Sequence, residues 1–325
     1  MSNQRGSALL IVLMILALMA ALASEMTISF QTQLQRSRRT NDSIQGKYAL
    51  LYAEAQATAQ TLQNAKDKLS QFDELPQFAE LRDNTTVSWQ TSDLQHCFNL
   101  NALADVPTDP MTTLPYKIEV FAALLEKIGV EKYRADEIAQ SGADYIDADV
   151  TPRVKGAEDE YYKSSQPGFL TAGQMIFLPA EIRKLKGMTD AIYQKLSPFI
   201  CATFSNELAI NINTLTEQQA PLLAALFLNN LSDSDAKTLL KKRPEGGWKT
   251  VDAFLYQAQQ DYSAAKPLTD SLKKQLTANS TFFLTTSTAH EGDLTSGMRT
   301  FFFYDEKNKT IKIYLRQLTD GSSEE

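Results

Sequence analysis

The pattern of apolar and polar positions begins with an apolar segment near the N-terminus. Residues 8–23 are all Ala, Leu, Ile, Val or Met, and Glu25 is the first charge after them. This length is enough to enter a bilayer, although a complete span needs about 20 residues. The chain from Glu25 to Asn64 contains no proline and a single glycine. We therefore predict one continuous helix over 7–64, roughly 85 Å long.

Two simpler interpretations of this segment remain open. A removable secretory signal peptide has a similar basic and apolar profile, but a small-residue cleavage site and a turn should follow it. The helical pattern that continues beyond Glu25 does not favour such a peptide. The second interpretation is an ordinary uncleaved signal anchor.

Alternating polar and apolar residues predict strands on both sides of the middle of the chain. Residues 85–90 alternate and are rich in strand-forming types, whereas 66–82 form a short amphipathic segment broken by Pro76. The C-terminal strand candidates are 280–287, 299–304 and 310–317, the last two joined as a hairpin. An isolated strand is not stable, so we expect 85–90 to pair with the C-terminal strands, which makes about 98–278 an insertion. The helical stripe predicted to pack on this sheet is Tyr48, Leu51, Tyr52, Ala55, Ala59 and Leu62.

The predicted insertion contains an internal repeat. Phe98-Asn99-Leu100-Asn101 returns as Ile210-Asn211-Ile212-Asn213, and helical periodicity follows each copy. The expected helices are 117–128 and 134–141 after the first copy, 218–229 and 234–241 after the second, and connecting helices within 178–196. Asparagine and threonine oxygens accept hydrogen bonds from first-turn amides, so the repeated motif is predicted to cap these helices. The repeat predicts two α units, at about 99–146 and 211–257.

Composition narrows the possible functions. The net charge of −7 argues against a nucleic-acid-binding protein, because such proteins present basic surfaces. Arg36, Arg38 and Arg39 form a tight basic cluster, which under ordinary insertion favours the cytoplasmic side of a membrane. The two histidines, His96 and His290, are isolated, and the sequence has no nucleophile elbow, phosphate-binding loop or zinc-protease motif. We therefore expect no enzymatic activity.

The two cysteines, Cys97 and Cys201, lie far apart in the sequence, and neither belongs to a CxxC motif. In an exported domain such a pair indicates a disulfide, whereas in the cytosol two buried thiols would be the default. A bridge that closes so long a loop would stabilise the fold by about 4 to 5 kcal/mol in the chain-entropy model.

The segment richest in possible ligands lies between residues 144 and 160. Carboxylate oxygens on a loop are the ligands that Ca²⁺ selects, although the spacing lacks the glycine and glutamate positions of an EF-hand. A solvated acidic loop is the competing interpretation, and the residues alone leave both open. The candidate calcium ligands are Asp144, Asp147, Asp149, Glu158 and Asp159. A bound cation would have a structural role, since it would relieve the repulsion between these carboxylates.

The N-terminal residues carry a resemblance to a known family. The short basic leader with Arg5, the Gly6-Ser7 junction and the apolar helix resemble a type IV prepilin signal, in which cleavage follows Gly6 and the helix stays on the mature protein. Most such subunits have Glu at the fifth mature position, whereas this chain has Ile11. The missing carboxylate, together with the order of helix, strand, α insertion and terminal sheet, resembles the minor pseudopilin K family of type II secretion systems.

This resemblance implies an α+β pseudopilin fold. A long N-terminal helix would pack on a small antiparallel sheet, and a large all-α domain with two helix-hairpin-helix-like units would be inserted into it. The implied parts are a prepilin leader (1–6), a transmembrane and assembly helix (7–64), the first part of the pseudopilin domain (65–97), the inserted α-domain (98–278) and the C-terminal antiparallel sheet (279–325).

The resemblance also implies a function. Such a protein would cap the pseudopilus tip and help to initiate its assembly, for the export of folded proteins across the outer membrane. It would cross the bacterial inner membrane once, with its globular part in the periplasm. The implied partners are the minor pseudopilins I and J and a prepilin peptidase that cuts after Gly6, with no nucleic acid. Family members are associated with calcium in the α-domain, which favours the calcium interpretation of the acidic segment.

A membrane-anchored DNA-binding protein of a competence-type system is the alternative. Helix-hairpin-helix units of that kind meet phosphate through glycine-rich turns with basic neighbours. Gly246-Gly247, close to the basic residues 241–243, is weakly similar to such a turn. The first copy of the repeat has Asp144 near the corresponding place, and its charge would repel phosphate.

Overall fold

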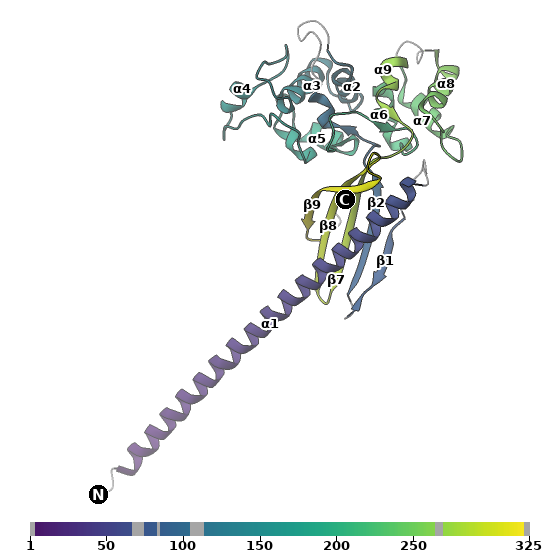
Figure 1. Cartoon of the computed structure of the whole chain (residues 1–325). Coiled ribbons are helices and arrows are strands. Elements are labelled where there is room, and N and C mark those ends of the chain that lie inside the picture. Colours follow the sequence, from purple (N-terminus) through teal and green to yellow (C-terminus); the bar gives the residue numbers. More distant parts are fainter. Residues whose placement is uncertain (1–3, 67–74, 83–84, 105–113, 264–268, 322–325) are drawn as a thin grey trace.

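The long helix predicted at the N-terminus is present. The computed structural model describes residues 4–66, 75–82, 85–104, 114–263 and 269–321. Within it, α1 (Gln4–Lys66) is one unbroken helix of 63 residues that extends from the rest of the molecule as a rod (Figure 1). Every residue from Ala8 to Asn41 is exposed. The continuous helix expected over 7–64 is thus confirmed, as the absence of proline leaves its hydrogen-bond ladder intact.

A five-stranded antiparallel sheet lies against the C-terminal half of α1. The strands, in their spatial order, are β1 (Gln77–Glu80), β2 (Thr86–Asp93), β7 (Phe282–Glu291), β8 (Leu294–Asp305) and β9 (Thr310–Thr319). β2 pairs with β7 from Thr86, opposite His290, to Asp93, opposite Phe283. The expectation that the early strand joins the C-terminal sheet, with an insertion between them, is confirmed.

The structure corrects two details of the predicted sheet. The segment 66–82 supplies the edge strand β1 in its described part, where an amphipathic segment was expected. β8 begins at Leu294 and forms a hairpin with β7 across Gly292, whose φ of +56° suits glycine. Residues 295–297 of β8 are small or polar, so hydrophobic alternation reveals only its second half.

Small side chains bring α1 close to the sheet. The buried cluster between helix and sheet consists of Ala49, Leu50, Ala53, Ala57, Val87, Trp89, Ala289 and Met298. The stripe predicted to make this contact is only partly engaged: Leu51 packs against the cluster and the Tyr52 ring meets Trp89 edge-on, whereas Tyr48 is 69% exposed. The helix therefore packs through its alanine face, which allows a closer approach than the tyrosine face would.

A buried charge also connects α1 to the sheet. The carboxylate of Glu54 accepts hydrogen bonds from Arg316 Nε at 2.7 Å and Arg316 Nη2 at 2.9 Å, and from Thr300 Oγ1 at 3.0 Å. Glu54 is 7% exposed, whereas half of the Arg316 side chain is exposed. This bidentate pair fixes the rotation of α1 about its own axis relative to β8 and β9.

The inserted domain forms the broad head of the molecule (Figure 1) and contains two units, each closed by a short parallel strand pair. The first unit comprises β3 (Phe98–Asn99), η2 (Leu100–Ala104), α2 (Tyr116–Lys127), α3 (Lys132–Ile146), α4 (Asp159–Lys163), η3 (Pro179–Lys184), α5 (Asp190–Leu196), η4 (Ser197–Phe199) and β4 (Ile200–Cys201). The second comprises β5 (Ile210–Asn211), η5 (Glu217–Gln219), α6 (Ala220–Leu226), α7 (Asp233–Lys241), α8 (Val251–Asp261), α9 (Thr269–Lys273) and β6 (Leu276–Thr277). β3 pairs with β4 and β5 with β6, so each unit closes well beyond the limits expected at about 146 and 257.

The second asparagine of each repeated motif stabilises its own unit from inside. It does not cap a helix, which corrects the prediction made from the sequence. Asn101 Nδ2 donates to the carbonyls of Ile176 and Thr203 at 2.9 and 2.8 Å, and its Oδ1 accepts from Ile176 N at 2.8 Å. In the second unit, Asn213 makes the same three bonds to Trp248 and Ala278, at 2.8 to 3.0 Å. Each side chain therefore crosslinks two remote backbone segments inside its unit, and the sequence repeat is a structural repeat.

The region where the chain passes from the sheet into the head, at Gln95 to Cys97, is crosslinked covalently, and we call it the neck. Cys97 and Cys201 form a disulfide next to the β3–β4 pair, in agreement with the pairing expected for an exported domain. Gln95, also in the neck, donates from Nε2 to the Ala209 carbonyl at 2.7 Å and accepts from Phe282 N at 3.2 Å. The chain entering the head and the chain leaving it are thus tied at one place.

Candidate cation site and assembly helix

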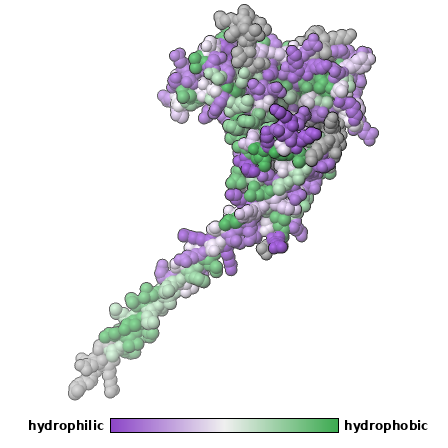
Figure 2. Space-filling view, viewed as in Figure 1, coloured by the Kyte–Doolittle hydropathy of each residue, from purple (hydrophilic) through white to green (hydrophobic). Residues whose placement is uncertain are grey.

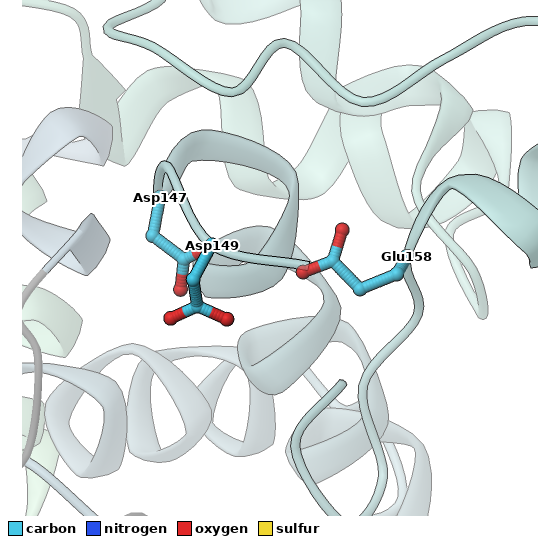
Figure 3. Close-up of side chains that lie close together, drawn as sticks. All are labelled: Asp147, Asp149 and Glu158. Carbon is cyan, nitrogen blue, oxygen red and sulfur yellow. The ribbon is translucent and has the colours of Figure 1, made fainter. Parts of the chain in front are cut away.

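The predicted acidic segment lies in the first unit, in the loop between α3 and α4. Asp147 follows the last residue of α3, Asp149 comes two residues later, and Glu158 precedes α4. One carboxylate oxygen from each residue lies within 4.8 Å of the other two. Figure 3 shows Glu158 reaching from its own segment toward the pair formed by Asp147 and Asp149. The fold therefore gathers three of the five candidate ligands at one point.

Asp144 is close to this group but already has a cationic partner. Arg153 Nη1 lies 2.6 Å from Asp144 Oδ1 and 2.6 Å from Asp147 Oδ2. A Cβ atom at Gly156 would come within 1.7 Å of Asp144 Oδ2, so the loop passes the carboxylate at a place that only glycine can occupy. Sequence reasoning did not identify Arg153, although its position inside the acidic loop was a signal for it.

Asp159 lies apart from the group. Its Oδ1 accepts hydrogen bonds from Thr171 N and Thr171 Oγ1, both at 2.9 Å, and Lys163 Nζ lies 3.5 Å from its Oδ2. These bonds lower the pKa of the Asp159 carboxyl, the backbone bond from Thr171 most of all. Asp159 thus anchors the following loop to α4, and we place it outside the candidate ligand set.

The electrostatics of the three-residue group indicate an excess of negative charge. Burial, followed by the charges of Asp144 and Asp147, raises the pKa of the Glu158 carboxyl to about 7. Burial also raises the pKa of Asp147, and it raises that of Asp144 to about 6 against the opposing effect of Arg153. Among the described residues, Glu158 Oε1 and Asp147 Oδ1 are buried oxygens without a hydrogen-bond partner.

The residues present fit a hard divalent cation. Asp147 Oδ1 and Glu158 Oε1 are buried oxygens that accept no hydrogen bond from the described residues, so they could coordinate a cation. Asp149 adds a third carboxylate from an exposed position. Ca²⁺ accepts such carboxylates together with backbone carbonyls and water to reach six to eight ligands. A bound cation would stabilise the charged carboxylates that burial now disfavours.

The residues of the predicted prepilin signal lie at the start of α1. Gly6 and Ser7 are in its first turns, and Ile11 is 59% exposed on its surface. The helix is long and apolar enough to cross a membrane, and the window that qualifies it is not buried against any described part of the protein. Figure 2 shows this apolar surface along the free end of the rod.

The basic residues beside the Gly246-Gly247 turn, which the DNA-binding alternative would use, have partners within the protein. Lys241 is paired with Glu217 at 3.3 Å, and Lys242 with Asp261 at 3.0 Å. Arg243 Nη2 donates to the Leu215 carbonyl. The basic side chains beside this turn are therefore engaged within the unit.

Comparison with known proteins gives one consistent result. Two family models, both described as type II secretion system (T2SS), protein K, match residues 96–205 and 210–279. A protein K of Escherichia coli K12 is 48% identical over 322 residues, covering 98% of each chain. The type II secretion system protein K of Klebsiella pneumoniae is 40% identical over 273 residues, covering 82% of this chain and 84% of that protein. The protein K of Aeromonas hydrophila is 34% identical over 335 residues, covering 98% of each.

A solved structure shows the same fold. The crystal structure of the GspK-GspI-GspJ complex from the type 2 secretion system of enterotoxigenic Escherichia coli contains a chain that matches with a TM-score of 0.72 and 29% identity. The match covers 86% of this chain and 99% of that chain. The first family model ends at residue 205 and the second begins at residue 210, so their boundary lies between the two closed units of the head.

Proposed function

The chain belongs to the type II secretion system protein K family and is a minor pseudopilin, and we propose that it forms the tip of the pseudopilus. The observation that carries this proposal is the shape of the molecule. The head stands at the end of the sheet that is remote from the apolar end of α1 (Figure 1), and it is much broader than the helix. In a shaft of packed helices, a subunit above this one would meet the head, so the end of the filament is where it fits.

Ile11 supports the same position. A carboxylate buried among apolar helices needs a partner in a neighbouring subunit. A first subunit has no neighbour above it, and an isoleucine at this place needs none. Because the chain then starts the filament, other subunits would add beneath it. A structural role of this kind involves no catalytic chemistry.

The experiment is an Ile11→Glu substitution with Ile11→Leu as its control. We expect the glutamate variant to reduce pseudopilus initiation by about tenfold or more, because an unpaired carboxylate in the bilayer costs several kcal/mol. The leucine variant should assemble normally. Normal numbers of pseudopili in the glutamate variant would contradict the tip assignment.

The proposal includes processing and location. We propose cleavage after Gly6 by a prepilin peptidase, a single crossing of the inner membrane by the N-terminal part of α1, and a globular part in the periplasm. The disulfide supports this location, since disulfides persist in oxidising compartments. The intact mass of the mature protein tests it: loss of residues 1–6, a modified N-terminus and an oxidised cysteine pair are expected. A mass that retains the leader would contradict the proposed processing.

The proposed partners are the minor pseudopilins I and J. The similar solved chain is part of a complex with GspI and GspJ, and the match includes 99% of that chain. We expect this protein to co-purify with its own I and J counterparts as a stable complex. Purification of this protein without either of them would contradict the assignment.

We also propose that Asp147, Asp149 and Glu158 bind Ca²⁺ as a structural ion. The support is the convergence of the three carboxylates and the two buried oxygens without partners. The ion would neutralise the group and fix the loop between α3 and α4. The loop in turn holds Arg153 against Asp144, so the site stabilises the first unit.

Thermal unfolding with calcium and with a chelator tests this proposal. We expect a higher melting temperature with calcium, and loss of the difference in an Asp149→Asn variant. Glu160 is an exposed neighbouring carboxylate, so Glu160→Gln is the matched control and should keep the full difference. Equal melting of the unmodified protein with and without chelator would remove the ligand assignment.

A further inference from the structure

Three arginines occupy the exposed middle of α1. Arg36, Arg38 and Arg39, which we call the arginine belt, are exposed and lie between the apolar end of the helix and the part that packs on the sheet. In the part of the chain that the structure describes, no ion pair joins these guanidinium groups to a carboxylate. The charge of the belt is therefore not neutralised by a carboxylate of the described residues.

The distance from the apolar segment places the belt at a membrane surface. Beyond Ala23 the exposed apolar residues Met26, Ile28 and Phe30 alternate with polar residues and follow Glu25. From Ala8 to Phe30 the helix measures about 33 Å, which matches a hydrocarbon thickness of roughly 30 Å with some tilt. Glu25 then lies about 8 Å from the end of this span, close enough for its exposed carboxylate to extend toward the interface. Phe30 would then lie near the interface.

The belt follows within the reach of lipid headgroups. Arg36 lies about 9 Å along the helix beyond Phe30, and Arg39 about 13 Å. Arginine side chains are long and extend back toward an interface, and the headgroup region adds several ångströms to the hydrocarbon. Figure 2 shows the apolar surface of the rod giving way to hydrophilic surface along this stretch of α1.

We propose that the arginine belt binds the phosphate groups of anionic phospholipids in the leaflet that faces the globular part. The planar guanidinium pairs with phosphate through two parallel hydrogen bonds. The three side chains point in different directions around the helix, because their spacing spans about 160° at 100° per residue. This inference rests on the membrane anchor of the proposed function.

Such binding would set the depth of the helix before assembly. Gly46 and Ala49 are the first buried residues of α1, about 10 to 15 Å beyond the belt. A helix held at the belt keeps its apolar segment in the bilayer and holds the sheet and head clear of the surface. Withdrawal of the subunit into a filament would have to break these contacts.

The test uses the full chain in bilayers that contain phosphatidylcholine and phosphatidylglycerol. Spin-labelled lipids report which lipid associates with the helix. We expect spin-labelled phosphatidylglycerol to associate about threefold more strongly than phosphatidylcholine, and this preference to weaken at high salt. A variant with Arg36→Gln, Arg38→Gln and Arg39→Gln should lose the preference. The matched control replaces the exposed lysines Lys237, Lys274 and Lys307 by glutamine and should keep it.

The outcomes separate the possible ligands. Equal association of the two lipids, or a preference that survives in the triple arginine variant, would overturn the inference. Competition by inorganic phosphate beyond that of chloride at the same ionic strength would indicate a free-phosphate site and also overturn it. If the triple arginine variant instead loses its I and J partners while the lipid preference is absent, the belt binds protein. If no lipid associates with the helix at all, the membrane anchor itself fails.

Discussion

Replacing Asn101 or Asn213 with alanine should destabilise the folded protein by a similar amount, about 3 kcal/mol each. Both side chains are buried, at 1% and 2% exposure, and each makes three hydrogen bonds to backbone atoms remote in sequence. Each bond contributes about 1 kcal/mol net, and alanine leaves two carbonyls and one amide without a partner. The equality of the two losses follows from the equivalence of the two units.

The measurement is urea unfolding of the full chain in detergent, followed by circular dichroism. Asn230 is exposed, so an Asn230→Ala variant is the matched control and should change the free energy of unfolding by less than about 0.5 kcal/mol. A loss below about 1 kcal/mol in either test variant would refute the clamping role of that asparagine. Losses that differ by more than about 2 kcal/mol would refute the structural equivalence of the units.

Three further predictions concern the sheet, its contact with α1 and the neck. Replacing Cys97 and Cys201 with serine should lower the free energy of unfolding by about 4 to 5 kcal/mol, since the bridge spans 104 positions; a reductant should then have no effect on the variant in urea. Glu54→Gln should lower the free energy of unfolding by about 1 kcal/mol, a small value because half of the Arg316 side chain is exposed. Thermal unfolding measures this loss, and an unchanged melting temperature would contradict the role of the pair. Burial raises the pKa of the Asp93 carboxyl, so the folded state binds this proton more tightly and this group's contribution to stability is lost as pH rises above about 4. Relative to the unmodified protein, Asp93→Asn should therefore gain in urea midpoint as pH rises from about 4, and a difference that does not change with pH would contradict this assignment.

The sequence predicts the large features of this fold because they depend on long segments. An apolar run followed by forty residues without proline predicts α1. Strand candidates on both sides of the middle of the chain predict the insertion, because they have to pair with each other. The packing face of α1 is not predictable in the same way. Hydrophobic size favours Tyr48 and Tyr52, whereas close approach to the sheet selects Ala49 and Ala53.

The candidate cation site is only partly predictable. The density of carboxylates identifies the loop, but which of them meet depends on how the loop folds. Arg153 takes Asp144 as its partner, and Asp159 turns toward Thr171. Both choices depend on contacts between residues 9 to 12 positions apart, across a loop whose course no periodic pattern records.

The repeat gives a similar lesson. The paired asparagines are visible in the sequence, and the equivalence of the two units follows from them. Their function is not visible, because the partners of Asn213 lie 35 and 65 positions away. Local capping chemistry is the simpler interpretation of such a motif, and tertiary hydrogen bonding prevails over it here.

The most direct test of the tip assignment is the position of this protein in assembled pseudopili. A gold label on a C-terminal tag, imaged by electron microscopy on isolated filaments, reports that position. The tip assignment predicts labels at one end of each filament and none along its length. Labels distributed along the shaft would contradict it.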